Sequence, residues 1–256
     1  YDGITTTEID GITLRAIVDL IDVESNPDVG HTNYQYVAGK QRLSMLRKDV
    51  YGSYDPPHLY EIVKKNVATG LYTPELLEWY SQEDWNRMND MIDHVKDEQY
   101  SYAAVEQLIE KYLVRNRATK EIYETPQVAY MLIAATLFQN YPKDTRIRWV
   151  KDYYDAISNH DISLPTPVMA GVRTPQKQFS SCVLIESGDS LDSINATSSS
   201  IVKYVSQKAG IGIGVGSIRD PMARMLPVLV LVLAAFVPLD HLYAMAMLTT
   251  QVLHLS

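Results

Sequence analysis

The sequence predicts a chain that is mainly helical over about its first 160 residues and then changes to an α/β arrangement. Three observations support this prediction. Apolar residues recur at helical spacing before residue 160. A short strand pattern then appears at residues 179–186, and a serine-rich, helix-like stretch follows at residues 190–206. Glycines alternate with other residues at 210–216, which is typical of backbone that another group approaches closely.

Composition places the chain among soluble globular proteins of one or two domains. Its 256 residues are 46% hydrophobic and 21% charged, with a formal net charge of −8. This acidic balance argues against a broad nucleic-acid-binding surface, which needs clustered Lys and Arg. A single cysteine fits a reducing compartment, so we expect a cytoplasmic protein. The chain begins at Tyr1 without a secretion signal, and we expect this start to be a truncation.

The first 50 residues predict two helices. Thr5 and its neighbours precede Glu8 in a capping arrangement, and isoleucines and leucines then recur at helical spacing to residue 21. Turn-forming residues occupy 26–30. The second helix is predicted over Tyr34–Val50, with cations near its end, where they suit the helix dipole.

Residues 51–160 also predict helices. Ser81 begins one of them, with Asp84 at the position that completes a capping box. Two further stretches, Tyr102–Val114 and Gln127–Phe138, are apolar at helical spacing.

The pattern changes after residue 161. Leu164–Pro167 is expected to be extended, because proline restricts itself and the residue before it. Phe179–Glu186 predicts a buried strand. Asp189 and Ser190 then precede the helix over Ser190–Ser206. They suit an N-cap, or a helix N-terminus that receives a phosphate while the Asp holds a ribose hydroxyl.

The glycine run has two interpretations. Its spacing, with glycine at 210, 212, 214 and 216, lacks the G-x-G-x-x-G pattern, and no Gly-Lys-Ser/Thr follows. It indicates either tight packing of a strand in a sheet or a backbone cradle for a phosphate, with Arg219 as counter-charge.

Cys182 is the one thiol of the chain, so it can form neither an intramolecular disulfide nor a multi-cysteine metal site. It is either an ordinary buried thiol or half of a redox pair. The hydroxyls of Thr166, Ser180 and Ser181 either satisfy local backbone or form a polar floor for a hydroxylated or phosphorylated ligand. The six histidines show no metal-ligand spacing, and we predict no metal site.

Taken together, the sequence closely resembles the large (alpha) subunit of class I ribonucleotide reductase. The resemblance extends from Tyr1 to Arg219 and is most specific in four long strings. These strings are Ile162–Pro175, Gln178–Glu186, Gly188–Ser199 and Ile201–Ile213.

The resemblance implies an enzyme that reduces ribonucleoside diphosphates to deoxyribonucleoside diphosphates. A radical would come from a small, metal-containing beta subunit, electrons from thioredoxin or glutaredoxin, and allosteric control from ATP and deoxynucleoside triphosphates. The complete subunit would be a homodimer, with no cofactor bound by this chain and with neither nucleic acid nor membrane as partner. The implied domains are the end of an ATP cone at 1–50, a helical domain at 51–160, and the first part of a ten-stranded α/β barrel at 161–219.

The resemblance also implies roles for individual residues. Cys182 matches one of the two cysteines that reduce the substrate. The other matches are Thr166, Ser181 and Gly210 at the substrate, Asp189, Ser190, Leu191 and Arg219 at the specificity effector, and Thr6 and Lys48 at the effector nucleotide of the cone.

Residues 220–256 depart from the family and form an unmatched apolar tail. Leu226 stands where a second effector arginine is expected, and the partner cysteine is absent. We therefore expect a fragment that is inactive alone; the alternative is a non-catalytic half of a split subunit that acts as a nucleotide-binding or assembly module. The tail is interpreted as a frame error, a split-gene end or a membrane-associating segment, although its uncharged run is shorter than a membrane span.

Overall fold

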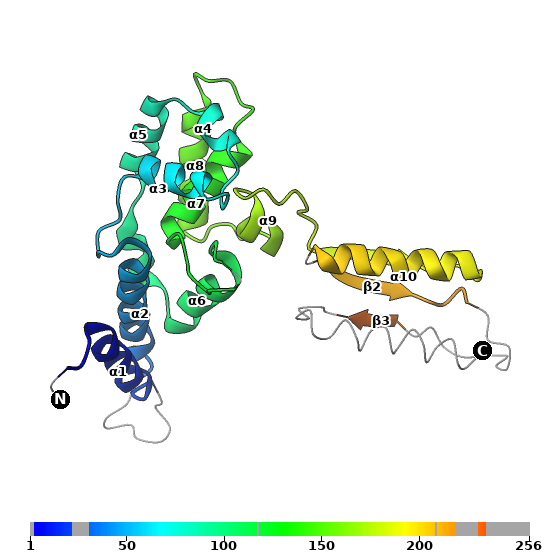
Figure 1. The fold of residues 1–256 in the computed structure, drawn as a ribbon, viewed down its shortest axis with the longest axis horizontal. Coiled ribbons are helices and arrows are strands. Elements are labelled where there is room, and N and C mark those ends of the chain that lie inside the picture. Colours follow the sequence, from blue (N-terminus) through cyan, green and yellow to red (C-terminus); the bar gives the residue numbers. More distant parts are fainter. Residues whose placement is uncertain (1–2, 22–30, 117, 208, 219–229, 234–256) are drawn as a thin grey trace. The chain divides into compact units, whose positions relative to one another are not determined.

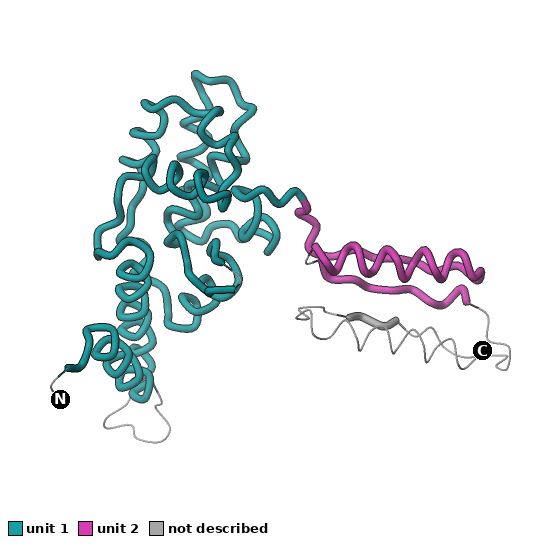
Figure 2. Tube along the Cα trace, viewed as in Figure 1, with its two compact units in different colours: residues 1–177 teal, residues 178–256 magenta. Residues whose placement is uncertain are grey.

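The computed structural model divides the chain into two compact units, residues 1–177 and residues 178–256 (Figures 1 and 2). The residues that the structure describes are 3–21, 31–116, 118–207, 209–218 and, as backbone, 230–233. The first unit is helical and the second combines strands with a helix, which confirms the predicted order of fold classes. The domain bounds at residues 50 and 160 stay predictions.

The first unit begins with two helices, α1 (Thr6–Val18) and α2 (Tyr34–Tyr51), as predicted. The capping box is confirmed, because the Thr5 hydroxyl accepts from the Glu8 amide while the Glu8 carboxylate accepts from the Thr5 amide. Helix α1 has no buried residue. The predicted turn at residues 26–30 lies outside the described residues.

Short helices complete the first unit. The capping box predicted at Ser81 is confirmed, with the Ser81 hydroxyl accepting from the Asp84 amide at 3.2 Å. The elements in order are α3 (Leu59–Ala68), α4 (Glu75–Trp79), α5 (Gln82–Met91), the 3₁₀ helix η1 (His94–Gln99), α6 (Tyr102–Gln107), the π turn η2 (Leu108–Tyr112), α7 (Pro126–Leu137), α8 (Arg146–Ser158) and α9 (Thr166–Gly171).

Two predicted boundaries in this unit are wrong. The helix predicted over Tyr102–Val114 changes to a π turn at Leu108 and ends at Tyr112. The segment predicted as extended through Pro167 is extended only to Pro165, because α9 begins at Thr166. Proline is tolerated in the first turn of a helix, where its missing N–H would have no intrahelical partner.

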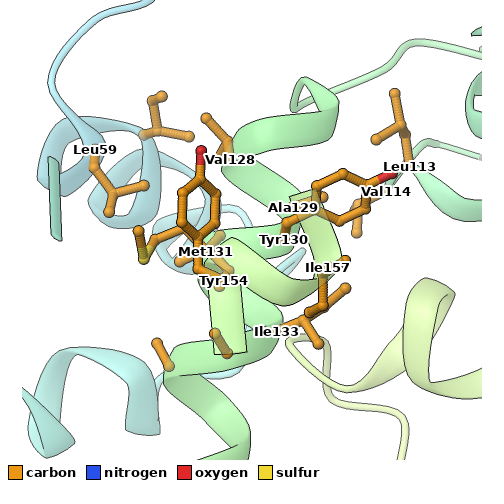
Figure 3. Packing of buried hydrophobic residues seen from close by; sticks show 14 of the residues in the cluster. Leu59, Leu113, Val114, Val128, Ala129, Tyr130, Met131, Ile133, Tyr154 and Ile157 are labelled. Atoms are coloured by element: carbon orange, nitrogen blue, oxygen red, sulfur yellow. The ribbon is translucent and has the colours of Figure 1, made fainter. Parts of the chain in front are cut away.

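Helix α7 forms the centre of the first unit's core (Figure 3). A helix that is apolar on all sides must be surrounded by other elements. Its residues 126–136 are all buried. Leu59 of α3 and Ile157 of α8 belong to the same cluster. The apolar run predicted as a helix at Gln127–Phe138 is therefore the element around which the first unit packs.

A buried carboxylate links α2, η1 and α7. Asp97 accepts a hydrogen bond from Gln127 Nε2 at 2.9 Å, and Arg47 Nη2 lies 3.8 Å from Asp97 Oδ2. Arg47 donates to the carbonyl of His94 at 2.6 Å instead. Among the described residues, no group hydrogen-bonds Asp97 Oδ2. Burial raises the pKa of Asp97 to about 7, against the opposing effects of Gln127 and Arg47.

Replacement of Asp97 by asparagine should change how stability depends on pH. Because the pKa of Asp97 is raised above its ordinary 3.8, the wild type loses stability as pH rises from about 4 through 7. An asparagine side chain carries no such charge, so the unfolding free energy of D97N should rise relative to the wild type by about 1.4 kcal/mol for each pH unit between the two pKa values. Urea unfolding of both proteins at about pH 4 and pH 8 measures this difference.

The comparison with D97N is needed because a second group titrates with the opposite sign. Burial lowers the pKa of His94 to about 4, so its contribution to stability is lost as pH falls below its ordinary 6.5. Subtracting the unfolding free energy of the wild type from that of D97N removes the contribution of His94, which both proteins share. An equal difference in unfolding free energy at both pH values would show that Asp97 is not buried as described.

The second unit contains a βαβ arrangement. Strand β1 (Cys182–Glu186) leads into α10 (Leu191–Ser206), and β2 (Gly210–Gly214) returns parallel to β1. Figure 1 shows β2 beside α10. A crossover helix is the usual connection between parallel neighbours. Strand β3 (Val230–Leu233) pairs antiparallel with β2. The predicted α/β arrangement after the helical region is confirmed.

The prediction that Phe179–Glu186 forms a buried strand is wrong in two respects. The strand begins at Cys182, and its residues alternate between exposed and half-buried positions. Leu184 is 88% exposed. Helix α10 packs against β1 and β2, and Val183 and Ile185 occupy the half-buried positions. Successive side chains of a strand point to opposite faces, so Cys182, Leu184 and Glu186 share the other face.

Candidate functional site

Cys182 lies at the amino end of the parallel strand pair. It is exposed, and its register partner in β2 is Gly210. The Gly210 amide donates to the carbonyl of Ser181 at 2.8 Å. The structure therefore brings together three of the residues predicted at the active site, which are Ser181, Cys182 and Gly210.

The alternating glycines lie on the same face of the sheet as the Cys182 thiol. A Cβ atom built on Gly210 would lie 3.6 Å from Cys182 Sγ, and one on Gly212 would lie 2.7 Å from Leu184 Cδ2. Gly214 lies beside Glu186 in the same way. An added side chain would therefore displace the end of Leu184 at Gly212, whereas at Gly210 and Gly214 it would make ordinary van der Waals contacts. This supports the interpretation of close strand packing; the phosphate cradle stays a prediction.

The predicted effector residues lie at the opposite end of β1. Ser190 is the N-cap of α10, and its hydroxyl accepts from the Ser193 amide at 3.1 Å. Leu191, the first residue of the helix, is 77% exposed. Asp189 lies directly before this N-cap, and it too interacts with another group of the protein. Cys182 and Glu186 are the first and last of the five residues of β1, so the two ends lie about 13 Å apart at the usual rise per residue. One βαβ arrangement therefore presents two separate groups of candidates.

The remaining candidates lie elsewhere. Thr166 is the first residue of α9 in the first unit. Thr6 begins α1, and Lys48 of α2 donates to Asp10 Oδ2 at 2.7 Å. The Asp10–Lys48 ion pair thus joins the two helices that carry Thr6 and Lys48. Arg219, the fourth effector candidate, lies outside the described residues.

Sequence reasoning missed a buried ion pair in the first unit, between Glu124 and Arg173. Arg173 Nε donates to Glu124 Oε2 at 2.8 Å, and Tyr72 donates to the same oxygen at 2.6 Å. Both charged side chains are fully buried. Burial, with the charge of Glu124, raises the pKa of Tyr72, so the phenol stays protonated and donates. The available signal was a charged residue within a family-like string, Arg173 in Ile162–Pro175.

The part of the chain that the structure describes offers neither a metal site nor a membrane-spanning helix. No group of three or more His, Cys, Asp or Glu side chains there lies close enough together to hold a metal ion. None of the described helices is long and apolar enough to cross a membrane. The membrane-associating segment that was one interpretation of the tail rests on residues 222–239, of which 222–229 and 234–239 lie outside the described residues.

Comparison with known proteins defines the class of protein. Residues 98–177 match the family model "Ribonucleotide reductase, all-alpha domain", and residues 180–225 match "Ribonucleotide reductase, barrel domain". These two matches meet near the division between the two compact units at residue 177. Residues 98–177 of the helical unit and the βαβ arrangement therefore match the two named domains.

Curated relatives narrow the class to one subunit. The chain is 57% identical over 219 residues to ribonucleoside-diphosphate reductase 1 subunit alpha of Escherichia coli, and 56% identical to the subunit alpha of Haemophilus influenzae. The subunit alpha of Enterobacteria phage T4 is 49% identical over 218 residues. The chain belongs to the family of class I ribonucleotide reductase alpha subunits and matches their amino-terminal region. The matched residues are about 86% of this chain but 28% of the E. coli relative's length.

Proposed function

We propose that this chain supplies the amino-terminal part of a subunit that reduces ribonucleoside diphosphates to deoxyribonucleoside diphosphates. The observation that carries this proposal is the exposed Cys182 thiol beside Gly210 and Ser181, in a βαβ arrangement that matches the reductase barrel. Cys182 is one thiol of a redox pair. Its partner thiol would come from chain beyond the matched residues, because this sequence holds one cysteine.

The chemistry requires two thiols. Each thiol gives up one electron and one proton as a disulfide forms, and the 2′-hydroxyl of the ribose leaves as water while hydrogen takes its place. A radical from a metal-containing beta subunit initiates the reaction, and thioredoxin or glutaredoxin reduces the disulfide afterwards. Thr166, Ser181 and Gly210 contact the substrate. An exposed thiol at a strand end suits this role better than a buried one, because substrate and reductant must both reach it.

Two further groups of residues bind effector nucleotides. Asp189, Ser190, Leu191 and Arg219 hold the deoxynucleoside triphosphate that selects the substrate. The first amides of α10 lie at this end of β1, and a helix N-terminus favours phosphate. Thr6 and Lys48 contact the nucleotide of the ATP cone. The complete subunit is a homodimer, and this chain alone does not catalyse the reduction.

A chimera tests the proposed function. Residues 1–219 of this chain replace the matched region of the E. coli subunit alpha, and the purified chimera is assayed with the E. coli beta subunit, thioredoxin and cytidine diphosphate. We expect deoxycytidine diphosphate to form. The same exchange with the Haemophilus influenzae segment controls for the junctions. A folded chimera without activity, beside an active control, would contradict the proposal.

A further inference from the structure

The buried pair of Glu124 and Arg173 has more hydrogen bonds than an ordinary ion pair. The Arg173 guanidinium donates to both carboxylate oxygens of Glu124, and Glu124 Oε1 also accepts from the Val114 amide at 2.7 Å. A second guanidinium nitrogen, Nη2, donates to the carbonyl of Tyr112 at 3.1 Å. The pair therefore connects Arg173 to the segment after η2 and to the residues that precede α7.

The same arginine also holds α9. Arg173 Nη1 donates to the carbonyl of Met169 at 2.6 Å, which lies within α9. The Arg173 carbonyl accepts from the Thr73 amide at 3.0 Å. The side chain of Arg173 therefore hydrogen-bonds to Glu124 and Tyr112, and its backbone hydrogen-bonds to Thr73. These bonds connect the end of α9 to other parts of the helical unit.

Helix α9 depends on tertiary contacts of this kind because it is short. It has six residues, and an isolated helix of that length is unstable in water. Met169 and the C-cap residue Val172 belong to the core cluster, and the partly buried Leu164 and Val168 pack against it. Thr166 at its start has no capping hydrogen bond from a side chain. The position of Thr166 therefore depends on how firmly the rest of α9 is held.

A buried ion pair is a poor means of gaining stability. The desolvation of both charges offsets most of their attraction, and apolar residues of similar volume often serve as well. What such a pair supplies is a fixed geometry, because a guanidinium and a carboxylate meet in a planar, two-bonded arrangement. This geometry joins Arg173, two residues after the end of α9, to Glu124, two residues before the start of α7.

We propose that Arg173 and Glu124 are positioning residues for the substrate site, which they serve by fixing α9 and therefore Thr166. This inference rests on the proposed function, in which Thr166 contacts the substrate. The pair touches neither substrate nor Cys182 in this role. It acts through the α9 backbone, with Tyr72 keeping the Glu124 carboxylate in place.

The test follows Thr166 and α9 in the whole chain. Threonine methyl labelling reports the Thr166 signal by NMR, and hydrogen exchange reports the Met169 and Val172 amides. In the wild type these amides should be protected nearly as well as those of α7. In R173K, which keeps the charge but loses the planar fork, we expect their exchange to rise by about tenfold or more. The Thr166 methyl signal should shift or broaden.

Arg146 provides a matched control. It is another buried arginine of the first unit and pairs with Asp84 at 3.0 Å, joining α8 to α5. R146K should lower thermal stability while leaving Thr166 and the α9 amides unchanged. Equal effects of R146K and R173K on Thr166 would overturn the inference, because the effect would then be a general loss of stability. An unchanged α9 in R173K would overturn it as well.

Two further measurements keep the outcome decisive. If R173K does not fold, E124Q takes its place, because glutamine keeps the shape of the side chain and removes its charge. Rapid hydrogen exchange of the α9 amides in the wild type would by itself contradict the inference.

Titration of the wild type with cytidine diphosphate is a separate measurement, followed by the Thr166 methyl signal. Absence of a shift there would count against the proposed substrate contact and leave the positioning result intact.

Discussion

Substitution of Gly39 by alanine should destabilise the helical unit by about 3 kcal/mol. Gly39 lies in α2, where the backbone of residues 100 and 101 passes directly over it. An added Cβ would overlap the carbonyl oxygen of Tyr100 and lie 3.1 Å from the carbonyl carbon of Ser101. Both obstacles are backbone, so α2 itself must move. Alanine's better helix propensity is worth about 1 kcal/mol and does not offset this overlap.

Gly11 of α1 gives the matched control. A Cβ atom there meets nothing within 4 Å, so G11A should stabilise the helix by about 1 kcal/mol. All three tryptophans lie in the first unit, at residues 79, 85 and 149, so urea unfolding followed by tryptophan fluorescence reports this unit alone. A G39A protein as stable as the wild type would contradict the close approach of α2 to Tyr100.

Removal of one charge from the buried pair should have an effect of similar size. Glu124→Met leaves the Arg173 guanidinium buried without its charged partner. Arg173→Met likewise leaves the Glu124 carboxylate buried without its charged partner. Each change should cost about 3–5 kcal/mol, a large part of the stability of a domain. The double variant leaves no unpaired charge, so it should cost clearly less than the sum of the two.

Arg87 supplies the control for this double-mutant cycle. It pairs with Glu83 on the surface of α5, with both side chains more than half exposed. Exposed pairs of this spacing contribute about 0.5 kcal/mol or less, so R87M should leave the tryptophan transition almost unchanged. A cost below about 1 kcal/mol for E124M would show that water reaches the pair.

The sequence predicted best what depends on neighbouring residues. Both capping boxes, at Thr5 and at Ser81, are visible because the bonded groups are three residues apart. The helix at Gln127–Phe138 was predicted from its apolar spacing, and the structure adds that residues 126–136 are all buried. An N-cap at Asp189 or Ser190 was one of two interpretations for the same local reason, and Ser190 is the cap.

The sequence could not predict contacts between distant residues. Glu124 and Arg173 are 49 positions apart, and neither has a local partner that would indicate the pair. The exposure of Leu184 also follows from packing, because the strand pattern alone does not show which sheet face another element covers. Of the candidate site, the family-like strings predicted the residues, while the strand register places Cys182 beside Gly210.

The oxidation state of Cys182 after one turnover tests the central claim most directly. The chimera with residues 1–219 is reduced, freed of reductant, and mixed with the beta subunit and cytidine diphosphate. Mass spectrometry then reads Cys182, with a C182S chimera as the blank. We predict a disulfide at Cys182 in an amount equal to the deoxycytidine diphosphate formed. Product formed while Cys182 stays a free thiol would contradict its assignment to the redox pair.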